Sequence, residues 1–224
     1  MIGLPNIYIM FKNRTEAAQQ LVKKLETYKN MDNAVVVTIP RGGLPIGYAI
    51  ATQLHLPLDI VLSKKIGHPY NKEFAIGAVT IKDIIISDKS YDVSEEYISH
   101  ETEKIRTLLK QRRDWYYGTS KPANLKDKTI IIVDDGVATG NTLISCIKLI
   151  EKQRPAEIIV ALPVGPPSVI KTIDKMPSVT KTISLLAPHD FRAVGQFYED
   201  FSPVDDNEVI YLLKKANDEF RQKV

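Results

Sequence analysis

The run Thr129-Ile-Ile-Ile-Val133 constrains the fold of this chain more than any other feature. Five consecutive β-branched residues predict a strand buried on both faces, because a strand with one solvated face alternates apolar and polar residues. The run ends at Asp134, where a loop of small residues begins, and residues 142–153 then show the periodicity of a helix. A buried strand that leads through a short loop into a helix is typical of a β-α-β unit.

The same order, a short apolar run and then a stretch with helical periodicity, recurs along most of the chain. The predicted strands are residues 34–39, 57–62, 129–133, 157–162 and 181–186, and the predicted helices are residues 15–28, 44–54, 142–153, 166–174 and 206–221. Strands that alternate with helices indicate an α/β fold with a mostly parallel, twisted sheet flanked by helices. In such sheets ligands bind at the carboxyl ends of the strands.

Composition narrows the class of protein further. The 224 residues suit one domain, or one domain with an added flap. The net charge of +3, from 30 basic and 27 acidic side chains, is too small for a protein that binds long nucleic acids through charge alone. Cys146 is the single cysteine, so no intramolecular disulfide can form, and no apolar run approaches the roughly 18 residues of a membrane helix. We therefore expect a cytoplasmic protein that binds neither nucleic acid nor membrane.

The loop after the central strand combines two kinds of chemistry. Asp134 and Asp135 leave the strand together, and Gly136-Val-Ala-Thr-Gly-Asn-Thr142 leads into the helix. The backbone N–H groups of a glycine-rich loop at a helix N-terminus bind phosphate, whereas two carboxylates repel it and suit hydroxyl groups or a metal ion. A ligand that satisfies both halves carries a phosphate close to vicinal hydroxyls, as ribose 5-phosphate does.

Other nucleotide-binding motifs fit this loop less well. A Walker A loop requires Lys where the chain has Asn141, and the dinucleotide fingerprint G-x-G-x-x-G is absent. A receiver domain would need another acidic residue after a later strand, and the strands that end at Leu162 and Leu186 supply none. An ordinary turn whose carboxylates cap the next helix is the plain structural alternative.

Residues 131–142, IIVDDGVATGNT, resemble the phosphoribosyl pyrophosphate motif of type I phosphoribosyltransferases at almost every position. The resemblance implies that Asp134 and Asp135 face the 2′ and 3′ hydroxyls of ribose and bind Mg²⁺, mainly through the substrate or through water. It also implies that the residues after the acidic pair hold the 5-phosphate: Gly136, Val137, Ala138, Thr139, Gly140, Asn141 and Thr142.

Further segments extend this resemblance over nearly the whole chain. They are residues 11–14 (FKNR), 39–43 (IPRGG), 65–67 (KIG), 75–78 (AIGA), 161–164 (ALPV) and 195–198 (GQFY). Together they resemble a subgroup of predicted phosphoribosyltransferases whose acceptor is unassigned.

Two basic segments occupy the places where the family binds pyrophosphate. In Pro40-Arg-Gly-Gly43, the resemblance implies that Gly42 and Gly43 shape the pyrophosphate loop, that Arg41 is catalytic, and that the peptide between Arg41 and Gly42 is cis. Lys65 follows the second predicted strand, and by the same resemblance it contacts the pyrophosphate. A solvated lysine pair, Lys64 and Lys65, is the alternative interpretation.

Two variable segments complete the comparison with the family. Residues 70–118 correspond to a flexible flap, enlarged here by a hairpin over residues 75–87 and a helix over residues 94–117. The exposed face of that helix is either simply solvated or a dimer contact. Residues 187–205 correspond to the hood over the acceptor, where Tyr198 and Phe201 either stack on a base or fill the core.

The resemblance implies an enzyme of nucleotide metabolism, a monomer or homodimer, with Mg²⁺ as its cofactor. It would transfer 5-phosphoribose from phosphoribosyl pyrophosphate to a nucleobase or related small acceptor. Enzymes acting on 6-oxopurines carry Asp at the position of Ala138, so the resemblance argues against hypoxanthine and guanine. Two alternatives stay open: a regulator that binds phosphoribosyl pyrophosphate without turnover, and an enzyme acting on another phosphorylated sugar or nucleotide.

Overall fold

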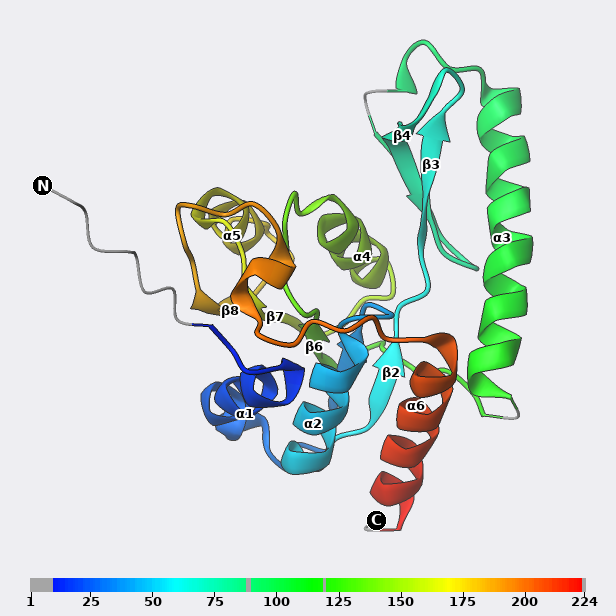
Figure 1. Cartoon of the computed structure of the whole chain (residues 1–224). Coiled ribbons are helices and arrows are strands. Elements are labelled where there is room, and N and C mark those ends of the chain that lie inside the picture. Colours follow the sequence, from blue (N-terminus) through cyan, green and yellow to red (C-terminus); the bar gives the residue numbers. More distant parts are fainter. Residues whose placement is uncertain (1–9, 88–89, 119, 223–224) are drawn as a thin grey trace, which may run out of the picture.

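A five-stranded parallel sheet forms the centre of the protein, which a computed structural model describes over residues 10–87, 90–118 and 120–222 (Figure 1). The strands are β1 (Ala34–Thr38), β2 (Leu58–Ile60), β6 (Thr129–Val133), β7 (Glu157–Val164) and β8 (Lys181–Leu186). Their order is β2-β1-β6-β7-β8, and every neighbouring pair is parallel. The predicted α/β fold with a mostly parallel sheet is confirmed.

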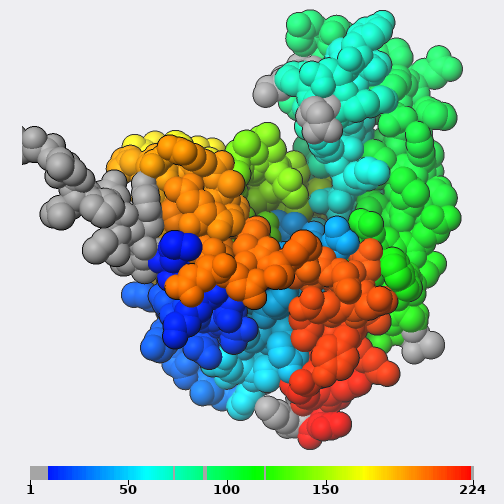
Figure 2. Space-filling model, in the orientation of Figure 1, coloured from blue at the N-terminus to red at the C-terminus, as the bar shows by residue number. Residues whose placement is uncertain are grey.

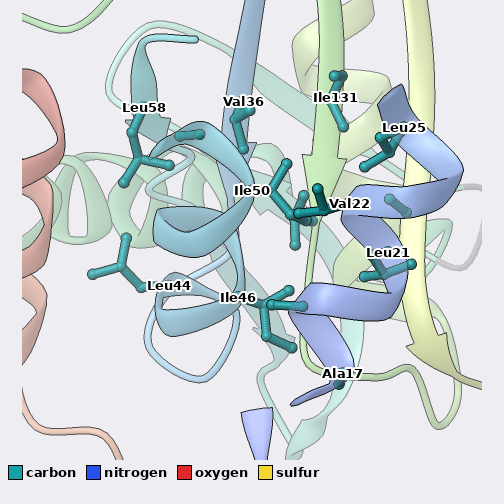
Figure 3. Close-up of a cluster of buried hydrophobic side chains, with 14 of the residues drawn as sticks. Ala17, Leu21, Val22, Leu25, Val36, Leu44, Ile46, Ile50, Leu58 and Ile131 are labelled. Carbon is teal, nitrogen blue, oxygen red and sulfur yellow. The ribbon is translucent and has the colours of Figure 1, made fainter. Parts of the chain in front are cut away.

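Helices cover both faces of this sheet. One face carries α1 (Arg14–Leu25), α2 (Leu44–Leu54) and α6 (Asp206–Arg221), and the other carries α4 (Asn141–Glu151) and α5 (Pro167–Asp174). Alternate residues of a strand point to opposite faces, so Val36 packs with α1 and α2 (Figure 3). Val37 points to the other face and packs with α4. All five residues of β6 are buried, as expected for a strand covered on both sides.

A second, antiparallel sheet stands beside the body of the protein (Figure 1). Its order is β3-β4-β5, formed by β3 (Lys64–His68), β4 (Asn71–Val79) and β5 (Ile84–Ile86). The long helix α3 (Glu95–Tyr117) covers it, with Ile105 and Leu109 packed against Ile66 and Ile76. This unit begins at β3, before the start of the flap expected over residues 70–118, and from here on we refer to residues 64–117 as the flap. Short 3-10 turns are also present at Glu26–Tyr28 and Val194–Phe197.

The predicted elements recur with small shifts at their ends, and one strand is new. The sequence does not predict β3, because Ile66 is its only aliphatic side chain. With Lys, Gly and His around it, the segment lacks the alternation of apolar and polar residues that is typical of a strand. β3 pairs with β4, so the predicted hairpin is part of a three-stranded sheet. Among the described helices, none combines the length and apolar character that crossing a bilayer requires.

A buried carboxylate fastens the end of the flap to the body. Asp59 on β2 is 4% exposed and accepts hydrogen bonds from the N–H groups of Ile60 (2.8 Å) and Ala123 (2.7 Å) and from the hydroxyl of Tyr117 at the end of α3. Burial raises the pKa of Asp59 to about 6, although these donors oppose the shift. Because a carboxylate buried without enough donors is costly, the Tyr117 hydroxyl stabilises the junction between flap and body.

We predict that Tyr117→Phe lowers the free energy of unfolding by about 1–2 kcal/mol at pH 7, because it removes one donor from a buried, ionised carboxylate. The loss should shrink below pH 6, where Asp59 becomes protonated. Urea unfolding at pH 7 and pH 5 measures both effects. Tyr70→Phe is the matched control, since Tyr70 is 93% exposed. Equal stability of the two variants at pH 7 would contradict this role of Asp59.

Candidate functional site

Two loops meet at the carboxyl ends of β1 and β6. These strands are neighbours in the sheet, and the N–H of Ile39 donates to the carbonyl of Val133 (3.1 Å). A Cβ atom on Gly43 would lie 2.9 Å from that same carbonyl oxygen, so the turn after β1 rests directly on the start of the acidic loop. β2, the next strand in the sequence, lies on one side of β1, and β6 lies on the other side, so the strand order reverses at β1. Ligands of open α/β sheets bind at such a switch point.

The acidic pair lies at this junction and is largely withdrawn from solvent. The N–H of Asp135 donates to the side chain of Asp134 (2.9 Å), and Asp135 is 9% exposed. Burial raises the pKa of Asp134 well above its usual range, and the neighbouring charge of Asp135 raises it further. Burial also raises the pKa of Asp135, while hydrogen bonds and the charge of Arg14 oppose that shift.

Glycine is required where the turn after β1 faces the acidic pair. A Cβ atom on Gly42 would lie 2.1 Å from Oδ2 of Asp135, so any side chain there would displace the carboxylate. The non-proline cis peptide expected between Arg41 and Gly42 is placed wrongly by one residue, since the structure has it between Pro40 and Arg41.

The second half of the acidic loop forms a cradle of backbone donors. Gly140 has a φ of +79°, a left-handed conformation that suits glycine, and it caps the N-terminus of α4. The first helical bond of α4 runs from Ile144 to the carbonyl of Gly140 (2.8 Å), so the N–H groups of residues 141–143 have no partner within the helix. The side chains exposed around them are Ala138, Thr139, Asn141 and Thr142.

The backbone N–H of Val137, which was predicted to bind the 5-phosphate, is hydrogen-bonded within the protein. Its N–H donates to the carbonyl of Val164 (2.9 Å), and its side chain is buried against α4. That donor is already used, and Val137 therefore shapes the loop from inside rather than offering its N–H to a phosphate. Gly136 is also buried, and a Cβ atom added to it would lie only 2.5 Å from Val194 in the predicted hood.

The two predicted cations occupy different parts of the protein. The side chain of Arg41 is half exposed, and its guanidinium lies 3.7 Å from Asp206 at the start of α6. The hydroxyl of Tyr116 at the end of α3 donates to the other oxygen of Asp206. Lys65 is exposed on β3 opposite Ala78, so it belongs to the flap, whereas Arg41 and the acidic pair belong to the body. Figure 2 shows the surface hollowed between the flap and the part of the body that carries α4.

The two predicted hood aromatics differ in their surroundings. Tyr198 is 3% exposed, its ring packs on Phe11 at 5.3 Å, and its hydroxyl donates to the carbonyl of Asp135 (2.6 Å). The structure therefore supports the core-filling alternative for Tyr198. Phe201 is partly exposed and stacks on Tyr198 with 5.0 Å between ring centroids.

Arg14, at the start of α1, is a site residue that the sequence analysis did not identify. Its Nε and Nη2 atoms donate to Oδ2 of Asp135 at 3.0 and 2.8 Å, and the two side chains are only 11% and 13% exposed. The partners are 121 positions apart, so no local spacing could connect them. The only signal was that Arg14 belongs to a segment of the family resemblance.

The acidic pair would bind a metal only together with a ligand. The described part of the chain holds no group of three or more His, Cys, Asp or Glu side chains that could enclose an ion. Mg²⁺ commonly keeps waters and binds through one or two carboxylates and substrate phosphates, and the two aspartates fit that mode.

The acidic pair, the backbone donors at the start of α4 and the glycine turn thus lie together at the switch point of a parallel sheet, where proteins of the open α/β class bind their ligands. Residues 6–202 match the model of the phosphoribosyl transferase domain, and the chain belongs to this family.

The relatives agree with this assignment. A Mycobacterium tuberculosis protein provisionally named as a phosphoribosyl transferase is 27% identical over 95% of this chain and 48% of its own length. The chain thus spans about half the length of the curated relatives it matches. The crystal structure of TT1426 from Thermus thermophilus has a TM-score of 0.81 and 30% identity, covering 92% of this chain and 98% of that one. A Neisseria gonorrhoeae protein solved with bound ppGpp shares the fold, at a TM-score of 0.51 and 15% identity over 93% of this chain and 96% of that one.

The burial of the acidic pair predicts a gain of stability when one charge is removed. Asp134→Asn keeps the side-chain acceptor for the N–H of Asp135 but removes the charge whose burial raises the pKa of Asp134. We expect its free energy of unfolding at pH 7 to exceed that of the unaltered chain by about 1 kcal/mol.

The pH dependence gives the sign of this effect. A carboxyl group whose pKa is higher in the folded state binds more protons there, so its contribution to stability falls as pH rises from about 4 through the folded pKa. The gain from Asp134→Asn should therefore grow over that range. Urea unfolding from pH 4 to 8 measures it, with the exposed Asp174→Asn as control. A destabilised Asp134→Asn at pH 7 would show that the Asp134 charge is well paired in the fold.

Proposed function

We propose that this protein transfers a 5-phosphoribosyl group from phosphoribosyl pyrophosphate to a small nitrogenous acceptor and releases pyrophosphate. The observation that carries the proposal is the junction of β6 and α4, where two carboxylates stand beside a cradle of backbone donors. The family membership and the position of this junction at the switch point of the sheet support the same activity.

The geometry suggests a role for each part of the site. Backbone N–H groups at the start of α4, with Thr139 and Thr142, would hold the 5-phosphate. Asp134 and Asp135 would accept hydrogen bonds from the ribose 2′ and 3′ hydroxyls. Arg41, with Gly42 and Gly43 in the same turn, would bind the pyrophosphate, and Lys65 would approach it from the flap.

The reaction needs positioning and charge stabilisation more than covalent catalysis. As the bond from C1′ to pyrophosphate breaks, positive charge develops on the ribose ring, as it does in glycoside hydrolysis. The buried carboxylates lie on the ribose side of the site, where a negative charge stabilises such a cation. The guanidinium of Arg41 would offset the charge of the leaving pyrophosphate.

Asp134 and Asp135 would hold Mg²⁺, which when bound would supply charge neutralisation of the leaving group. Because Arg14 already occupies one oxygen of Asp135, we infer that the protein holds the ion mainly through the ligand and water.

The acceptor side favours some bases over others. Ala138 is exposed in the loop, at the position where family members acting on 6-oxopurines have Asp. Without that carboxylate, we expect no turnover with hypoxanthine or guanine. Phe191 and Phe201 are the partly exposed aromatic side chains of the hood, and we expect Phe201 to contact a flat acceptor.

The test is pyrophosphate release from phosphoribosyl pyrophosphate and Mg²⁺ over a panel of purine, pyrimidine and pyridine bases. We expect release with at least one base other than hypoxanthine and guanine, and none after Mg²⁺ is removed with a chelator. Asp135→Asn should reduce turnover at least about 100-fold, because it removes a charge from the ribose side of the site. Asp174→Asn is the control for the loss of an exposed carboxylate.

Two outcomes would contradict the proposal. Undiminished turnover by Asp135→Asn would remove the acidic pair from the mechanism. Tight binding of phosphoribosyl pyrophosphate without release for any base would favour a regulator that only binds this ligand.

A further inference from the structure

Arg14 joins three parts of the protein that are far apart in the sequence. Its guanidinium donates twice to Asp135 in the acidic loop, and its Nη1 donates to the carbonyl of Ser202 in the hood at 2.8 Å. The same guanidinium lies over the ring of Phe201, 4.0 Å from the ring centroid. One buried cation therefore contacts both the ribose side and the acceptor side of the proposed site.

The orientation of the Asp135 carboxylate follows from these contacts. Both Arg14 hydrogen bonds go to the same oxygen, Oδ2, and the backbone of Gly42 approaches that oxygen so closely that a Cβ atom would be 2.1 Å away. Oδ2 is thus fixed between a guanidinium and the turn after β1. With one oxygen fixed, the direction of Oδ1 is fixed as well, and Oδ1 is the oxygen that these two bonds leave to a ligand.

The backbone around Arg14 holds the guanidinium in place. The N–H of Phe11 donates to the carbonyl of Phe197 (2.8 Å), and the N–H groups of Glu199 and Asp200 donate to the carbonyls of Phe11 and Lys12 (both 2.9 Å). Asn13 then caps α1, of which Arg14 is the first residue. The segment before α1 is therefore bound to the hood, beside which it lies in Figure 1.

Tyr198 of the hood also contacts the acidic loop. The hydroxyl of Tyr198 donates to the carbonyl of Asp135, and the ring of Tyr198 stacks on Phe201 with an angle of 28° between the ring planes. The route through Tyr198 ends at the backbone carbonyl of Asp135, whereas the route from Phe201 through Arg14 ends at the Asp135 carboxylate.

We propose that Arg14 is a positioning residue that couples the acceptor hood to ribose binding. It keeps the Asp135 carboxylate in the orientation that the ribose hydroxyls need, and it keeps that orientation dependent on Phe201. This inference rests on the proposed function, because it assigns the coupling to the same phosphoribosyl pyrophosphate site. Lysine cannot replace Arg14 fully, since an ammonium lacks the planar fork that donates twice and stacks on a ring.

The experiment measures the affinity for phosphoribosyl pyrophosphate with Mg²⁺ by calorimetry, together with the thermal unfolding midpoint. Arg14→Gln should weaken binding at least about tenfold, and Arg14→Lys by a smaller factor of about three to ten. Phe201→Leu should weaken binding several-fold even though Phe201 lies on the acceptor side. Arg192→Gln is the matched control, because Arg192 lies in the hood with 84% of its side chain exposed.

The double variant Arg14→Gln with Phe201→Leu isolates the coupling. If Phe201 acts through Arg14, the double variant binds no more weakly than Arg14→Gln alone, whereas independent effects would multiply. Arg14→Lys and Phe201→Leu should keep the unfolding midpoint within a few degrees, which separates positioning from loss of the fold. They also keep the test decisive if Arg14→Gln does not fold.

Three results would overturn the inference. Unchanged affinity in both Arg14→Lys and Phe201→Leu would remove Arg14 as a positioning residue. Losses that multiply in the double variant would remove the coupling between hood and acidic loop. If the unaltered chain does not bind phosphoribosyl pyrophosphate, the proposed function fails, and this inference fails with it.

Discussion

The parallel pairing of β1 with β6 is the constraint on which the rest of the structure depends. Five register pairs, from Ala34 with Thr129 to Thr38 with Val133, bring two loops together that are about 95 residues apart in the chain. The strands end at the same level, so the turn that contains Gly42 and the loop that contains Asp135 emerge side by side. The burial of β6 on both faces keeps this register, because a shift by one residue would exchange the side chains that face α1 and α2 with those that face α4.

This junction brings a free-energy cost that the surrounding structure offsets. Two adjacent carboxylates stand where burial raises the pKa of both, and the ion pair that the structure describes for them joins the buried Arg14 to Asp135. If the site binds ribose hydroxyls and a cation as proposed, its carboxylates are under-compensated until the ligand binds, and functional sites are commonly less stable than they could be for such reasons. Arg14, Tyr198 and the glycine turn hold the pair in place, and the large core of the parallel sheet supplies the stability.

Much of this architecture was predictable from the sequence, and the exceptions have physical reasons. The strand at residues 129–133 is a continuous β-branched run, and it and the helices at residues 44–54 and 206–221 recur with the predicted bounds. β3 lacks a clear pattern in the sequence, because Ile66 is its one residue in the hydrophobic cluster of the flap. The loop motif located Asp134 and Asp135, but it did not show that the N–H of Val137 is already used or that Tyr198 is buried, since both depend on tertiary packing. The contact between Arg14 and Asp135 joins residues 121 positions apart in the sequence, and no local pattern encodes it.

The proposed function requires that the β6–α4 junction bind the phosphoribosyl group. A crystal structure of the protein grown with Mg²⁺ and phosphoribosyl pyrophosphate tests it most directly. We expect the 5-phosphate at the N-terminus of α4, within hydrogen-bond distance of the N–H groups of residues 141–143. We also expect the ribose hydroxyls at Asp134 and Asp135, with Arg14 still bound to Oδ2 of Asp135. A ligand bound in another part of the protein, or a phosphate at this junction with the ribose hydroxyls turned away from both aspartates, would contradict it.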